Sequence, residues 1–224
     1  MKRIFAILMT ICLLAGALSI TAFAAEETYK SKDELPAPAA DVVLRITAIK
    51  GDDIELVGDH TNFEDGWNEA MEYANDMEDY GYDRIVVDLY ADWNAASNGD
   101  FTEDFFNGAG FKWDTIYFND EVRMTLNMNG HTINRRCPRG VENGEVIYID
   151  DDADVIINNG TITGGWSRNG GGGIFLDDDA KLVLNDVHIK DNIADIDCGG
   201  GISICSGATL IMKGGSFEDN VADS

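Results

Sequence analysis

Three copies of one sequence unit follow each other in the second half of the chain, and this repetition constrains the fold more than any other feature. Two copies fill Gly171 to Ser224, and at a shift of 28 positions Gly171-Gly172-Gly173-Ile174 falls on Gly199-Gly200-Gly201-Ile202. A shift of 27 positions places Asp150-Asp151-Asp152 on Asp177-Asp178-Asp179. Self-similarity at such a period is typical of a solenoid, in which each repeat packs only against its neighbours.

Apolar residues alternate within each repeat, as at Ile174/Leu176, Leu182/Leu184 and Val187/Ile189. A spacing of two residues is that of a β-strand. We predict three short strands per repeat, with corners at 177–179, at 185–186 and over 191–200. Stacked about 4.8 Å apart, successive coils would enclose a column of Ile, Leu and Val. The pattern therefore predicts a parallel β-helix.

The GGGI strings and the FxxN string Phe217-Glu218-Asp219-Asn220 resemble repeats of polymorphic outer-membrane and adhesin-type surface proteins. The segment from Met124 to Ile133 resembles a coil that is common in secreted β-helical proteins of Gram-positive gut bacteria. The chain resembles the pectin-lyase-like superfamily, and these resemblances cover about half of its length. They imply an all-β fold, a right-handed parallel β-helix, which in that superfamily serves many functions.

Residues 1–24 have the pattern of a secretory signal peptide, with Lys2 and Arg3, an apolar run from Ile4 to Ile20, and Ala22-Phe23-Ala24 as the cleavage site. We expect a bacterial protein that is secreted or displayed on the cell surface, with no transmembrane segment in the mature chain. The formal net charge of the whole chain is −25. Such a field makes nucleic acids and anionic membranes poor partners.

Three regions are predicted after the signal peptide. Residues 25–40 are polar and contain proline, and we expect a disordered leader there. Residues 41–82 are predicted to form an N-terminal cap, with a hairpin of Val42–Ile46 and Asp53–Val57 and one amphipathic helix from Thr61-Asn62 to about Gly81. The helix face from Phe63 to Met77 would cover the open end of the first coil or, alternatively, dock a partner.

The β-helix itself is expected over residues 83–224. Arg84–Tyr90 would open its first coil, and residues 94–110 would form a polar loop of the kind that often carries function. The last residues, 217–224, stop where another GGGI strand would begin. We therefore expect the β-helix to be truncated at its C-terminal end.

The two aspartate triplets would lie about 5 Å apart on neighbouring coils. Calcium takes six to eight oxygen ligands, often from flexible carboxylate-rich loops. A Ca²⁺ ion held by Asp150, Asp151, Asp152, Asp177, Asp178 and Asp179 is one hypothesis. The alternative is a solvated acidic corner whose charges point into water.

Trp166 and Arg168 lie in a Gly-rich stretch, where an indole beside a guanidinium could stack on a sugar ring. A Trp that only covers apolar atoms is the alternative. We predict no catalytic residues, because Arg168, Lys181 and Lys190 are available bases outside any recognisable motif. The sequence therefore favours an adhesin-like binding or structural module for polysaccharide or cell-surface glycans, and the enzymatic alternative is a pectate-lyase-like polysaccharide lyase that uses Ca²⁺.

Overall fold

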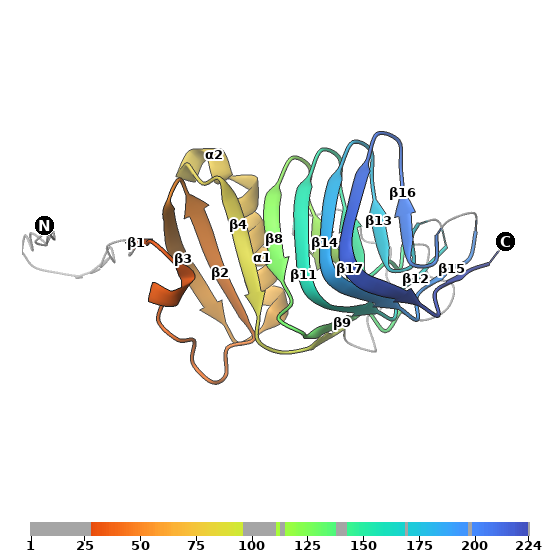
Figure 1. The fold of residues 1–224 in the computed structure, drawn as a ribbon, viewed down its shortest axis with the longest axis horizontal. Helices are drawn as coiled ribbons and strands as arrows, with labels where there is room; N and C mark the ends of the chain where they lie inside the picture. The colour runs from red at the N-terminus through yellow and green to blue at the C-terminus, as the bar shows by residue number, and fades with distance from the viewer. Residues whose placement is uncertain are drawn as a thin grey trace, which may run out of the picture.

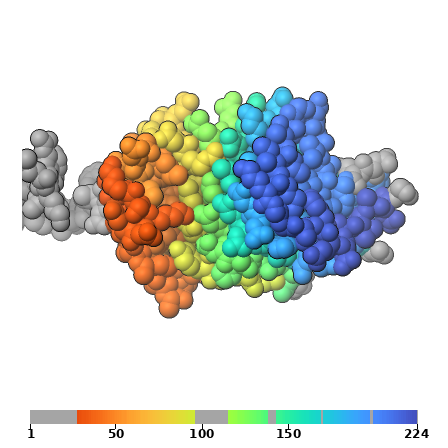
Figure 2. Space-filling view, in the orientation of Figure 1, coloured from red at the N-terminus to blue at the C-terminus, as the bar shows by residue number. Residues whose placement is uncertain are grey.

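The computed structural model describes residues 28–95, 111–112, 115–137, 143–168, 170–196 and 199–223. The described part is elongated, and successive segments of the chain follow one another along its long axis (Figures 1 and 2). The predicted signal peptide lies outside the described residues, as does most of the predicted 94–110 loop. None of the helices in the described ranges has the length and apolar character that a membrane crossing requires.

A β-solenoid of about 4 turns fills the C-terminal half of the chain. All four turns contribute strands to the first sheet and to the long sheet, and the last three turns also contribute a strand each to the third sheet. The first sheet holds β7 (Thr115–Phe118), β10 (Ile147–Ile149), β13 (Ile174–Leu176) and β16 (Ile202–Ile204). The long sheet holds β8 (Arg123–Asn127), β9 (Thr132–Asn134), β11 (Asp154–Thr163), β14 (Lys181–Lys190) and β17 (Thr209–Glu218). The third sheet holds β12 (Trp166–Ser167), β15 (Ile193–Ala194) and β18 (Val221–Ala222).

The strand register confirms the two repeat shifts. Ile147 pairs with Ile174, which pairs with Ile202, and all three strands run parallel. The inward residues Val155, Ile157, Leu182 and Leu184 are fully buried. Alternation of apolar residues therefore identified the column that fills the solenoid.

The predicted corners differ in kind. Only the corner at 177–179 separates two strands in the predicted way; at Asp186, with φ of 53°, β14 bends without ending. The stretch predicted as the third corner contains the short strand β15. Left-handed backbone at such bends favours Asp, Asn and Gly, whose side chains tolerate positive φ.

The predicted hairpin is present as β2 (Leu44–Lys50) and β3 (Asp53–His60). β4 (Arg84–Leu89), predicted to open the first coil, lies antiparallel to β2 and parallel to β8. It therefore joins the N-terminal strands and the solenoid into one sheet. The short β5 (Trp93–Asn94) pairs with β9, and β6 (Phe111–Lys112) pairs antiparallel with β7.

Two helices make the fold mostly β rather than all-β. α1 (Phe63–Asn75) begins after Asn62, whose side chain accepts a hydrogen bond from the Asp65 amide at 3.0 Å. The helical conformation is interrupted at Asp76 and resumes as α2 (Met77–Tyr80), so the single predicted helix is in fact two. Trp67 packs edge-on against Phe118 of β7, with ring centroids 5.1 Å apart. α1 thus contacts the first solenoid turn, the end that we expected it to cover.

The leader differs from its prediction. Residues 28–40, expected to be disordered, contain β1 (Thr28–Tyr29), which pairs with β3, and the 3₁₀ turn η1 (Lys32–Glu34). Local composition suggested disorder, but Lys32 forms an ion pair with Asp88 at 2.9 Å. The Arg45 guanidinium also donates to the Pro36 carbonyl at 2.7 Å.

Candidate functional site

The two aspartate triplets lie at one corner of the solenoid, where the first sheet meets the long sheet. Asp150–Asp152 join β10 to β11, and Asp177–Asp179 join β13 to β14 in the next turn. Oxygens of Asp150, Asp151 and Asp177 lie within 4.8 Å of one another, and Asp177 and Asp178 form a similar group with the Cys205 thiol. The structure therefore brings four of the six predicted carboxylates into these groups, and neither group includes Asp152 or Asp179.

Each triplet is also held by hydrogen bonds of its own. The first Asp accepts the amide of the second, at 3.1 Å in Asp150 and 2.9 Å in Asp177. The second oxygen of each accepts a tyrosine hydroxyl, from Tyr117 to Asp150 and from Tyr148 to Asp177. Asp178 accepts the Ser206 amide at 2.9 Å. These hydrogen bonds satisfy part of the acceptor capacity of the carboxylates at the corner without a cation.

The electrostatics of the corner reflect this crowding. Partial loss of hydration, together with the charges of Asp177 and Asp150, raises the pKa of the exposed Asp151 carboxyl. Burial and the hydrogen bonds to Asp150 and Asp177 raise the pKa of Tyr117 and Tyr148 well above the usual tyrosine range. Both hydroxyls therefore stay protonated and remain donors to the carboxylates.

The donor set at this corner suits a hard cation in part. Carboxylate oxygens are the ligands that Ca²⁺ prefers, whereas the thiol of Cys205 is a poor ligand for it. In the first group, Asp151 differs from the other two residues. Among the described residues, its carboxylate accepts no hydrogen bond from a tyrosine hydroxyl or from a neighbouring backbone amide. Any bound cation would depend chiefly on Asp151 and on the remaining acceptor sites of Asp150 and Asp177.

Tyr117 and Tyr148 belong to an aromatic row that sequence reasoning missed. Tyr117 stacks on Tyr148 with ring centroids 4.8 Å apart, and Tyr148 stacks on Phe175 at 5.0 Å. The row runs along the outer face of the first sheet and ends at Ser203 in the fourth turn. The rings cover one another, so the faces inside the row are closed to a ligand. The 27-residue shift already aligned Tyr148 with Phe175.

The other predicted site is on β12, at the far end of β11 from the Asp150–Asp152 corner. Trp166 pairs in register with Ile193, which pairs with Val221, and Arg168 is exposed just after the strand. Trp166 is partly exposed, whereas Ser167 beside it is fully buried. The structure does not bring Trp166 and Arg168 together with the aspartate triplets.

The glycines next to this site have a steric cause. A Cβ on Gly171 would lie 2.0 Å from the Ile174 carbonyl oxygen, and one on Gly172 would lie 2.5 Å from that of Ile193. Side chains cannot occupy such positions, because backbone of the first sheet lies too close to Gly171 and backbone of the third sheet lies too close to Gly172. The GGGI strings are therefore explained by packing, with no ligand required.

A buried charged cluster next to Ser167 was also missed. Arg135 and Glu145 are 1% and 5% exposed, and Ser167, fully buried, accepts the Gly170 amide at 2.9 Å. Burial raises the pKa of the Glu145 carboxyl, while Ser167 and Arg135 oppose that shift. Neither residue follows the apolar alternation, so the sequence pattern gave no signal for their burial.

One surface chain of hydrogen bonds has the residue types of a catalytic triad without its order. His188 Nδ1 lies 2.8 Å from Ser216 Oγ, and Ser216 Oγ lies 2.7 Å from a Glu218 carboxylate oxygen. In a serine hydrolase the histidine lies between the serine and the acid, so that the acid orients the base. Here the serine is central and the residues lie on an open sheet face. Glu218 therefore bonds to the serine and does not orient the imidazole.

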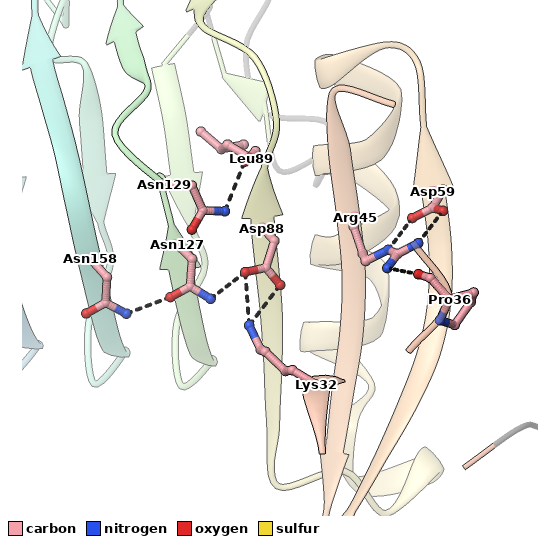
Figure 3. A network of polar contacts seen from close by, with 9 residues as sticks. All are labelled: Lys32, Pro36, Arg45, Asp59, Asp88, Leu89, Asn127, Asn129 and Asn158. Carbon is pink, nitrogen blue, oxygen red and sulfur yellow. Dashed lines mark hydrogen bonds and ion pairs between the residues drawn. The ribbon is translucent and has the colours of Figure 1, made fainter. Parts of the chain in front are cut away.

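A row of amides crosses the long sheet. Asn185 donates to Asn158 at 2.6 Å, Asn158 donates to Asn127 at 2.7 Å, and Asn127 donates to Asp88 at 2.8 Å. Part of this row is visible in Figure 3. The three asparagines occupy equivalent positions in successive turns. We call Asp88, Asn127, Asn158 and Asn185 the amide ladder.

Two surface hollows lie elsewhere. One of about 470 Å³ is bordered by the end of α1, by α2 and by Asp120, Glu121 and Arg123. Another of about 240 Å³ is bordered by the start of α1 and by Asp92, Trp93 and Asn94. Neither contains Trp166, Arg168 or a residue of the aspartate triplets.

Comparison of the chain with models of known protein families, with characterised proteins and with solved structures finds no match.

Proposed function

We propose that the protein is a secreted or cell-surface bacterial module that binds glycans in an adhesin-like manner. The proposal includes the right-handed parallel β-helix of the pectin-lyase-like class. Its support is a solenoid whose outer faces carry side chains in register from turn to turn. Ligands with a repeating structure, such as polysaccharides, are matched by a surface with its own repeat.

The observation that carries the proposal is the row on the third sheet. Trp166, Ile193 and Val221 form an apolar line along the solenoid, and the exposed Arg168 lies two residues after Trp166. A partly exposed indole offers an apolar surface to the faces of sugar rings, and the guanidinium donates hydrogen bonds to hydroxyls or carboxylates. Polysaccharide and cell-surface glycans are therefore the proposed partners, whereas nucleic acids are disfavoured by the charge.

Binding to an immobilised glycan panel that includes neutral and uronate polysaccharides tests the proposal. We expect Trp166→Ala to lower affinity about tenfold or more, as expected for the loss of an aromatic anchor. Arg168→Gln should weaken uronate binding more than binding of neutral glycans. His188→Ala, an exposed change on the long sheet, is the control. Equal binding by all variants, or no binding by the wild type, would refute the glycan proposal.

A pectate-lyase-like activity is the second candidate, and the grouping of Asp150, Asp151 and Asp177 within 4.8 Å favours it. Such chemistry would use Ca²⁺ to neutralise a uronate carboxylate and a base to remove the adjacent proton. Lys181, exposed at the start of β14, is the described base that follows the corner most closely in sequence.

Calorimetric titration with Ca²⁺ and an ultraviolet assay for unsaturated products on polygalacturonate separate the possibilities. Calcium binding that Asp151→Asn abolishes, together with product formation, would establish the lyase. Binding without product would make calcium a structural ligand. If neither calcium binding nor product formation is observed, both the lyase and the calcium site are eliminated.

A further inference from the structure

The segment from Thr28 to Ala40, here called the strap, crosses the N-terminal part of the long sheet. It begins with β1 on the outer edge of β3, where Thr28 and Tyr29 pair with Glu55 and Ile54. Lys32 in η1 donates to both carboxylate oxygens of Asp88 on β4, each at 2.9 Å. The Pro36 carbonyl accepts from Arg45 on β2 at 2.7 Å (Figure 3).

The face under these contacts is buried but polar. Arg45 is 4% exposed and Asp88 is 8% exposed, and the two residues are paired in register on β2 and β4. Arg45 also makes a two-pronged ion pair with Asp59, at 2.6 and 2.7 Å. Next to them, Thr47 is fully buried, and its hydroxyl has no hydrogen-bond partner among the described residues. Such a face gains little from apolar burial.

The strap contributes correspondingly little apolar contact. No side chain of η1 is buried, and β1 has 2 residues. Its side-chain anchors are charged: Lys32 with Asp88, and Lys30 with Asp53 on β3. Ion pairs of this exposure stabilise a fold only weakly, and salt screening weakens them further. The strap therefore belongs to the part of the molecule that opens most easily.

Asp88 connects the strap to the solenoid. The same Oδ1 atom accepts from Lys32 at 2.9 Å and from Asn127 of the amide ladder at 2.8 Å (Figure 3). Release of Lys32 leaves the Asn127 hydrogen bond in place. Opening of the strap can therefore occur without loss of register in the solenoid.

We propose that the strap is an ion-pair latch that guards the outer edge of β3, opening at high salt while the solenoid stays folded. An unguarded edge strand presents unpaired N–H and C=O groups to other chains. In the closed state β1 covers this edge at Ile54 and Glu55, and Lys32 holds the following turn on Asp88. In the open state both the edge and the polar face at Arg45, Thr47 and Asp88 are accessible to solvent.

Hydrogen exchange read by mass spectrometry tests the latch in the wild type, in Lys32→Met and in the control Lys181→Met. Lys181 is an exposed lysine on β14 of the same sheet. We expect Lys32→Met to speed exchange about two- to fivefold in peptides covering 28–35 and 53–58, the factor that corresponds to one partly exposed ion pair. Peptides covering β11 and β14 should exchange as in the wild type.

Salt provides a second arm that needs no variant. Raising NaCl from about 20 mM to about 1 M shortens the Debye length from roughly 20 Å to 3 Å and should reproduce the Lys32→Met pattern in the wild type. The same salt step should have a smaller effect on the 28–35 peptides of Lys32→Met, in which only the Lys30–Asp53 pair remains to be screened. The latch is refuted if those peptides respond to neither change, or if they exchange at the unprotected rate in low salt.

Discussion

Asp152 and Asp179 occupy equivalent corner positions, each with φ of 55°, in the left-handed region. The same position is Glu121 with φ of 60° in the first turn and Gly207 with φ of 74° in the fourth. Entering this region costs most residues about 1–2 kcal/mol, and less for Asp, Asn and Gly. The backbone alone therefore accounts for the third residue of each aspartate triplet, independently of calcium.

Replacement of Asp152 separates the backbone role from an ionic one. We expect Asp152→Gly to change the free energy of unfolding by less than about 0.5 kcal/mol, because relief of the left-handed strain offsets the flexibility of glycine in the unfolded chain. Asp152→Ala should lose about 1 kcal/mol. Urea unfolding measures both. Equal losses in the two variants would instead point to the carboxylate as the stabilising group.

The tyrosine hydroxyls at the corner predict an alkaline dependence of stability. The folded-state pKa of Tyr148 is raised above the value of about 10 expected in the unfolded chain. The unfolded state therefore releases this proton first, so the contribution is fully present below pH of about 10 and is lost as pH rises above it. Tyr148→Phe keeps the ring stack and removes the hydroxyl bonded to Asp177.

Urea titrations at a series of alkaline pH values should show a shallower decline for Tyr148→Phe than for the wild type. Near pH 7 the variant should be about 1 kcal/mol less stable, the typical net value of one hydrogen bond. An identical alkaline slope in both proteins would mean that Tyr148 does not hold its proton in the folded state.

At the scale of elements, α1 packs so closely on the sheet that its glycine has no substitute. A Cβ on Gly66 would lie 2.8 Å from Leu44 Cδ2 and 2.9 Å from His60 Cβ. Helix propensity alone predicts that Gly66→Ala stabilises by about 1 kcal/mol. Because β2 and β3 leave no room, we expect a loss of about 1–3 kcal/mol instead.

Asn68→Ala, on the exposed face of the same helix, is the matched control and should gain a few tenths of a kcal/mol from propensity alone, about 0.5 at most. Thermal and urea unfolding of the two variants should therefore shift in opposite directions. A stabilised Gly66→Ala protein would show that α1 is not seated on β2 and β3 in this way.

The amide ladder ties four strands of the long sheet together. Asn158→Ala removes the hydrogen bonds to both Asn127 and Asn185, which are partly exposed, so that water can replace the lost partners. We expect a loss of about 1–2 kcal/mol for the two bonds. Asn127→Ala and the double variant complete a cycle, and a sum that is simply additive would deny cooperation along the ladder.

The elements divide into those that local pattern could predict and those that it could not. Alternation of apolar residues and the 27- and 28-residue shifts predicted β10, β13, β14, β16 and β17, because each turn repeats the same packing problem. The strap could not be predicted, since its anchor joins Lys32 to Asp88, 56 positions away. The aromatic row was hidden for a similar reason: Tyr117 pairs with Tyr148 across a first turn of 31 residues, longer than the later repeats.

The candidate site was also predictable only where it follows the sequence repeat. Period alone placed the aspartate triplets on neighbouring turns, which the structure confirms. The tyrosine partners of these aspartates could not be predicted without knowing which strand of the preceding turn lies beside each corner. The burial of Arg135 and Glu145 could not be predicted either, because neither residue carries a local signal for it.

At the scale of the whole molecule, one apolar core continues from α1 through the solenoid. It joins Trp67 and Met71 of the helix to Phe118 of the first turn and Leu184 of the third. Around this core lies a surface with a formal chain charge of −25. Repulsion among these charges opposes compaction, so apolar packing in the core must outweigh this repulsion for the protein to stay folded.

That balance predicts opposite responses to salt in the core and in the strap. Screening weakens the net repulsion among carboxylates, so raising NaCl from about 20 mM to about 500 mM should increase the urea midpoint of global unfolding. The Lys32 latch depends on attraction and should loosen over the same range. Circular dichroism reports the global transition, and hydrogen exchange at residues 28–35 reports the strap. A lower urea midpoint at high salt would mean that ion pairs, among them Arg84 with Asp154 at 2.7 Å, outweigh the repulsion in holding the fold.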